Sequence, residues 1–60
     1  MSPFEIWEIG TEAAKTSSPV ELTAHDGKQF RGHLTYVEEN FLALDGLGFP
    51  CEDVKELVIL

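Results

Sequence analysis

The sequence predicts a mostly β protein, in which a short N-terminal helix precedes a five-stranded, strongly bent antiparallel barrel. A helix-capping pattern opens the chain, and from Pro19 onward short apolar runs alternate with turn signals. Gly32 stands in the middle of the longest run, where a glycine favours a sharp bend. Five short strands in a meander, one of them strongly bent, describe a small closed barrel. The chain is thus predicted to be one domain, with the helix or arm and a linker in residues 1–18 and the barrel in residues 19–60.

The helix is expected near the N-terminus. Ser2, Pro3 and Glu5 stand in the order of a capping box with proline at the first helical position. Gly10 interrupts the pattern before the letters TSSP end it, so the sequence predicts a bent or frayed helix, with an extended arm as the alternative. Four apolar side chains of this segment are expected to pack on the barrel or on a neighbouring molecule: Phe4, Ile6, Trp7 and Ile9.

The first two strands are predicted in residues 20–24 and 28–37. Apolar and polar residues alternate in the first run, and Asp26-Gly27 then indicates a type I′ hairpin turn. In the second run Val37 falls out of the apolar phase. The residues that share this phase are Phe30, Gly32, Leu34 and Tyr36.

The remaining strands are shorter. Residues 41–44 are nearly all apolar, which is typical of a central strand covered on both sides. Residues 45–48 turn the chain, and Phe49 begins a very short strand that Pro50 limits. A tight turn then leads into the last strand, residues 56–60.

Composition narrows the classes of function. Eleven acidic residues against four basic ones give a net charge of −7, which disfavours non-specific nucleic-acid binding. The charges fit either a solvated surface or an acidic face that docks a basic partner. A chain of 60 residues buries a small core, so a partner subunit is the expected brace. Cys51 is the only cysteine, and with His25 and His33 it makes no tetrahedral metal site.

Neither a membrane protein nor an enzyme is expected. No apolar run approaches the ~20 residues that span a bilayer, and the N-terminus lacks the order of a signal peptide. We therefore expect a cytoplasmic, soluble protein without a cofactor. No nucleophile, base and orienting group can be assembled from the sequence.

Several segments together resemble the Sm, LSm and Hfq family of SH3-like barrels. They are the SPF start, the D-G turn, the G-x-L of the second strand and the FPCEDVKELVIL ending, and they cover nearly the whole chain. SPVELTAHDGKQFRGHL, residues 18–34, is particularly similar to bacterial Hfq. Gly27 suits a turn with positive φ, and Gly32 lets its strand curl around the core.

The resemblance implies a homo-oligomeric ring, in which the fourth strand of one subunit joins the fifth strand of the next. The apolar last strand fits this arrangement, because its edge should not face water alone. The expected interface residues are Phe49, Leu57, Val58, Ile59 and Leu60.

The resemblance also implies an RNA site. Asn40 would read a base through its amide, Phe41 or Tyr36 would stack on it, and Arg31 and His33 would meet phosphate. Each has a structural alternative: a left-handed turn for Asn40, core packing for the two aromatic rings, and a surface ion pair for Arg31.

The basic half of the family's RNA pocket is missing. Pro50-Cys51 stands where Sm and LSm proteins have an R-G pair and Hfq has a lysine and a histidine. We therefore expect an Sm/Hfq-like oligomeric binding module, an RNA-associated scaffold with a degenerate pocket and weak RNA affinity. One alternative is an acidic adaptor that occupies a basic nucleic-acid-binding protein, and another is a purely structural oligomer.

Overall fold

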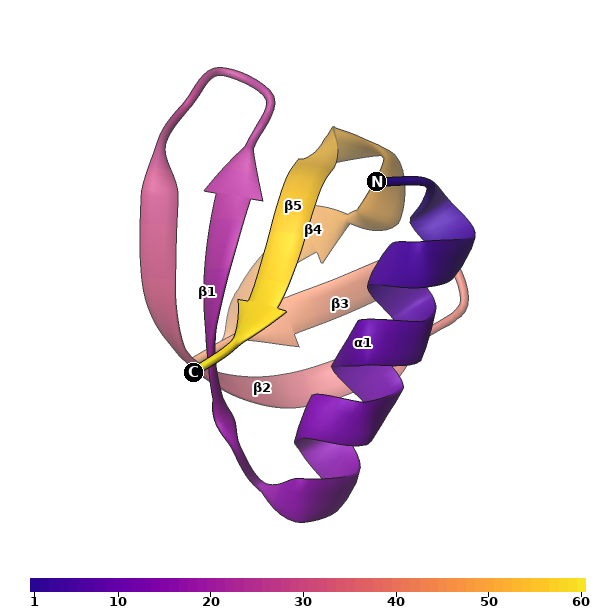
Figure 1. The fold of residues 1–60 in the computed structure, drawn as a ribbon, viewed down its shortest axis with the longest axis vertical. Coiled ribbons are helices and arrows are strands. Elements are labelled where there is room, and N and C mark those ends of the chain that lie inside the picture. Colours follow the sequence, from indigo (N-terminus) through magenta and orange to yellow (C-terminus); the bar gives the residue numbers. More distant parts are fainter.

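The computed structural model describes all 60 residues as one helix packed against a five-stranded antiparallel sheet (Figure 1). This arrangement confirms the predicted mostly β fold with an N-terminal helix. The elements in chain order are α1 (Pro3–Thr16), β1 (Pro19–Ala24), β2 (Gln29–Glu38), β3 (Phe41–Leu44), β4 (Leu47–Pro50), the 3-10 turn η1 (Cys51–Asp53) and β5 (Val54–Ile59).

Helix α1 begins with the predicted capping box. The Glu5 N–H donates to Ser2 Oγ at 3.2 Å, and the Ser2 N–H donates to the Glu5 carboxylate at 2.9 Å. That backbone hydrogen bond lowers the pKa of Glu5. The predicted interruption at Gly10 is wrong, because α1 continues unbroken to Thr16. Gly10 is buried against the sheet, and burial of this helix face stabilises helical backbone that the glycine alone would weaken.

The sheet has the strand order β4-β3-β2-β1-β5. β2 pairs with β1 through residues 29–33 and with β3 through residues 34–38, so the sheet folds over at the middle of β2 (Figure 1). β4 and β5 do not pair, so the predicted closed barrel is not formed. The short turn η1 leads the chain from one edge of the sheet to the other. The sheet is open, with β4 and β5 as its edges.

A β-bulge divides β2 and changes which side chains reach the core. The register with β3 shifts between Leu34 and Tyr36, which leaves Thr35 as the extra residue. An extra residue reverses the alternation of faces beyond it. Val37 therefore packs on the core, whereas Tyr36 is 52% exposed, contrary to the predicted phase. Thr35 Oγ1 accepts the Gly46 N–H at 3.1 Å, which ties the bulge to the turn between β3 and β4.

The turn between β1 and β2 differs from the prediction. Of Asp26-Gly27, only the glycine has a positive φ, 90°, whereas a type I′ turn needs positive φ at both central positions. The Gly27 N–H donates to Ala24 O and the Ala24 N–H donates to Lys28 O. This three-residue loop is the hairpin form that ends on a left-handed glycine.

The type I′ turn occurs instead at Asp45-Gly46, where φ is 49° and 85°. The Asp45 carboxylate accepts the His33 N–H at 3.2 Å, and the Asp45 N–H donates to His33 O at 2.9 Å. The carboxylate lies over Gly32, where an added Cβ would come within 2.8 Å of Asp45 Cγ. Gly32 is therefore required by this close approach within the bent strand.

The core lies between α1 and the sheet. Nine buried side chains form one cluster: Ile6, Ala13, Val20, Leu22, Leu42, Leu44, Cys51, Val54 and Leu57.

Neither α1, with its 14 residues, nor η1 has the length and apolarity to cross a bilayer.

Candidate functional site

The loop between β2 and β3 contacts η1. The Cys51 N–H donates to Asn40 O at 2.9 Å, and Asn40 lacks the left-handed φ that its turn position suggested. A hollow of about 210 Å³ lies beside this contact and contains a carboxylate but no cation. Its lining residues are Pro3, Asn40, Pro50, Cys51 and Glu52.

Cys51 is a core residue rather than a reactive group in this hollow. Its side chain is 1% exposed. Burial raises the pKa of the Cys51 thiol, and the nearby negative charge of Glu38 raises it further. The thiol therefore stays protonated at neutral pH and packs as a small buried hydrophobe.

Tyr36 and Glu38, which are exposed, and the half-buried Phe41 form a group on the outer face of β2 and β3, which we call the tyrosine platform. The Tyr36 and Phe41 ring centroids are 6.3 Å apart with planes at 58°. The Tyr36 hydroxyl donates to Glu38 Oε2 at 2.7 Å, and this hydrogen bond, followed by the carboxylate charge, raises the pKa of Tyr36. The Phe41 ring lies over Gly48, where a Cβ would come within 2.5 Å of Phe41 Cζ.

Arg31 and His33 lie on the other half of β2, the half that pairs with β1. Arg31 Nε lies 2.7 Å from Glu21 Oε2, with the two side chains 72% and 21% exposed. This ion pair is the alternative that the sequence favoured for Arg31. The predicted RNA residues are thus divided: Arg31 and His33 lie before the bulge of β2, whereas Tyr36 lies beyond it, Asn40 in the following turn and Phe41 in β3.

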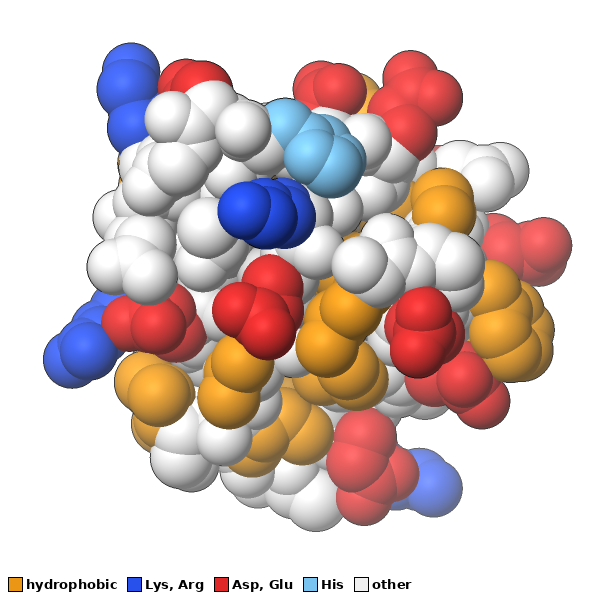
Figure 2. Space-filling model, turned by 45° about the horizontal axis from the view of Figure 1, so that its top comes forward, with side chains coloured by type: hydrophobic (Ala, Val, Ile, Leu, Met, Phe, Trp, Pro, Cys, Tyr) orange, Lys and Arg blue, Asp and Glu red, His pale blue; other side chains and the backbone are white.

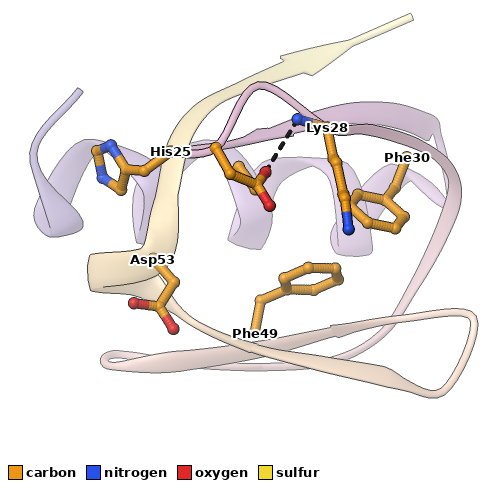
Figure 3. A pocket seen from close by; sticks show the side chains of 7 residues that line it. His25, Lys28, Phe30, Phe49 and Asp53 are labelled. Atoms are coloured by element: carbon orange, nitrogen blue, oxygen red, sulfur yellow. Dashed lines mark hydrogen bonds between the residues drawn. The ribbon is translucent and has the colours of Figure 1, made fainter.

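A second hollow, of about 390 Å³, opens between the β1–β2 loop and the β4–η1 segment (Figure 3). The Phe30 and Phe49 rings lie side by side along it, with centroids 5.1 Å apart and planes tilted by 59°, and the Lys28 side chain extends beside Phe30 (Figure 3). Sequence reasoning missed this site, whose only signal was a phenylalanine in each of two strands that the fold brings together. The lining residues are Ala24, His25, Asp26, Lys28, Phe30, Phe49 and Asp53.

The residues predicted for a subunit interface fall into two groups. Leu57 is fully buried in its own core, and Phe49 is half-buried at the second hollow. The other three, at the end of the chain, are exposed by 43%, 38% and 56%: Val58, Ile59 and Leu60.

The outer edge of β5 carries free backbone groups. The Leu60 N–H donates to Pro19 O in β1. Because backbone groups alternate in direction along a strand, those of Val58 also face β1, whereas those of Ile59 face away. On the same outer edge, the N-terminal amine donates to Lys55 O at 3.1 Å, and Figure 1 shows the N-terminus beside the start of β5.

Charge on the surface is predominantly negative. On the face that Figure 2 shows, acidic side chains are widely spread, whereas basic side chains stand apart from one another. No three His, Cys, Asp or Glu side chains gather where they would hold a metal ion. Comparison with protein-family models, curated proteins and solved structures finds no match to this chain.

Proposed function

We propose that this chain is an Sm-like, partly Hfq-like small β-barrel that acts in the cytoplasm as an oligomeric binding module. The observation that carries the proposal is the pair of unpaired sheet edges, β4 and β5. In the proposed ring, β4 of one copy pairs with β5 of the next, so that each copy completes the sheet of its neighbour. The acidic, degenerate pocket then makes RNA a weak ligand of the assembly.

Both edges have the chemistry that strand pairing needs. An exposed strand edge is a template for another chain, and β5 offers the outward backbone groups of Ile59. At β4, the two-residue turn makes Leu47 a hydrogen-bonded partner of Leu44, which directs the Gly48 backbone groups outward. Leu47 and Leu60 add exposed apolar side chains, 53% and 56%, close to these edges.

Light scattering at micromolar concentration tests the assembly directly. We expect a mass several times the 6.7 kDa of one chain. The sharper test is Ile59→Pro, which removes an outward N–H without removing a hydrogen bond to β1. This variant should lose the oligomer, whereas Val58→Thr, which keeps every backbone N–H and β-branching, should retain it. A folded monomer of the unmodified chain would refute the ring.

RNA affinity is expected to be weak because the pocket beside Asn40 contains Glu52 and no cation. Stacking contributes about 1–3 kcal/mol per base, which is too little without cations at the phosphates. Binding of U-rich and A-rich oligomers at about 150 mM salt should be weak or absent. Submicromolar affinity that Asn40→Ala abolishes would instead establish a working pocket.

A second candidate function is an acidic adaptor that binds a basic protein. It is favoured by the tyrosine platform, where an exposed carboxylate and two aromatic rings lie together without a cation of this chain. A basic protein captured on the immobilised chain and released by salt would support this candidate. Capture that persists unchanged at about 1 M salt would count against it.

A further inference from the structure

We infer that the tyrosine platform binds an arginine side chain of a basic partner protein. This inference rests on the second candidate function and names the contact that would make it. The guanidinium would lie against the Tyr36 and Phe41 rings and donate to the Glu38 carboxylate. Charge complementarity favours this occupant, since the chain has a net charge of −7 and the platform joins a carboxylate to an exposed tyrosine ring and a half-buried phenylalanine ring.

The bulge at Thr35 is what creates the platform. Without the extra residue, Tyr36 would continue the core phase of Phe30 and Leu34. With it, the ring is turned outward and left 52% exposed, although the chain has a small core in which an aromatic ring would be useful. Thr35 fixes the bulge through its hydrogen bond with the Gly46 N–H. Bulges commonly re-aim a side chain at sites of function.

The Glu38 carboxylate is oriented and only half used. One oxygen accepts the Tyr36 hydroxyl at 2.7 Å, and the side chain forms no other hydrogen bond and no ion pair within the chain. A second donor therefore meets a carboxylate that is already held beside the ring. Glu39, which follows Glu38 in the chain, is also exposed.

Arginine fits this arrangement better than lysine. The planar guanidinium stacks on aromatic faces and donates to a carboxylate at the same time, whereas an ammonium is a compact, strongly hydrated charge. RNA fits worse, because the carboxylate would face phosphates. A second copy of the chain is not the donor: its single arginine, Arg31, is already paired with Glu21.

The probe for the test is a fluorescently labelled glycine–serine peptide that carries several arginines, followed by anisotropy at about 50 mM salt. Two peptides of the same length carry lysine or the uncharged analogue citrulline in place of arginine. Wild-type protein should bind the arginine peptide most tightly, the lysine peptide less tightly, and the citrulline peptide not measurably. An equal affinity for the arginine and lysine peptides would overturn the stacked geometry.

Variants locate the site. Tyr36→Leu and Glu38→Gln should each weaken the arginine peptide by about threefold or more, as expected for exposed cation–π and charge-assisted contacts. Glu56→Gln makes the same change of charge at an exposed position of β5, and it should weaken binding by less than about twofold. Thermal unfolding of each variant confirms that the fold persists, and Tyr36→Phe retains a ring if the leucine variant fails to fold.

The outcomes separate this inference from the functions on which it rests. Equal weakening by Glu38→Gln and Glu56→Gln would show that only net charge matters, which would refute the site but keep the acidic adaptor. No binding of any cationic peptide by the wild type would refute both. Direct binding of labelled U-rich RNA that Tyr36→Leu weakens would assign the rings to nucleobases instead. The oligomer is measured independently, so a monomer that binds arginine would refute only the ring.

Discussion

The two Asp-Gly turns have the same dipeptide and different structures. Asp26-Gly27 ends β1 in a three-residue loop, and its carboxylate reaches only the Lys28 N–H, at 3.0 Å. Asp45-Gly46 forms the type I′ turn, and its carboxylate crosses to β2 to accept the His33 N–H. The first loop has a backbone tie to η1, where the His25 N–H donates to Asp53 O at 3.3 Å, but its aspartate side chain makes only a local contact. The second aspartate is tied to a distant strand through both its backbone and its side chain.

The difference teaches that a dipeptide signals a reversal of the chain without fixing its type. Asp45 is held in the left-handed region because its backbone and side chain both bond to His33. Such tertiary hydrogen bonds offset the energetic cost of a left-handed backbone conformation at a residue that has a Cβ. Asp26 has no such partner across the sheet, and the glycine beside it takes the left-handed position instead.

The strongest test of the comparison is Gly32→Val. The new side chain would occupy the space of the Asp45 carboxylate, so we expect a loss of about 2 kcal/mol or more in the free energy of unfolding. Urea denaturation measures the loss. The smaller change Gly32→Ala should lower the free energy of unfolding much less in an Asp45→Gly background, where the opposing side chain is absent, than in the wild-type background. Equal losses in the two backgrounds would show that Asp45 is not the cause.

Removing the two carboxylates should show the same contrast more weakly. Asp45→Ala loses the hydrogen bond to His33 and places alanine at φ 49°, for an expected cost of about 2 kcal/mol. Asp26→Ala loses only the local bond to Lys28, for about 0.5–1 kcal/mol. Asp45→Asn keeps an acceptor oxygen and tolerates left-handed backbone, so it should remain close to the wild type. Equal losses for the two alanine variants would contradict the comparison.

Gly10→Ala supplies the reverse case, a glycine that neither turn geometry nor close approach requires. A Cβ there would lie 3.5–3.6 Å from side chains of β2 and β3, in ordinary van der Waals contact. Alanine in a helix interior is more stable than glycine by about 0.5–1 kcal/mol. The melting temperature should therefore rise modestly. A fall in the melting temperature would mean that α1 cannot shift even slightly against the sheet to make room for the added methyl group.

The candidate sites were predictable only in part. The segments of Asn40 and Pro50-Cys51, named for an RNA pocket, are joined by the hydrogen bond from the Cys51 N–H to Asn40 O, and RNA binding there stays a prediction. The sequence anticipated the ion pair of Arg31. It placed Tyr36 in the core phase and did not identify the hollow between Phe30 and Phe49, whose rings come from strands that are not hydrogen-bonded neighbours.

The sequence by itself determined the capped helix, the existence of five strands and the residue pairs at which the two Asp-Gly reversals occur, because capping boxes, apolar alternation and glycine act over a few neighbouring residues. It placed the start of the fourth strand at Phe49, whereas β4 begins at Leu47. Tertiary structure decided the course of α1 through Gly10, the type of each turn, the open sheet and the outward aim of Tyr36. Each of these depends on a partner far away in the chain: a sheet face, the His33 backbone, or the register of β3. A bulge above all cannot be read from one strand, since it exists only relative to the strand beside it.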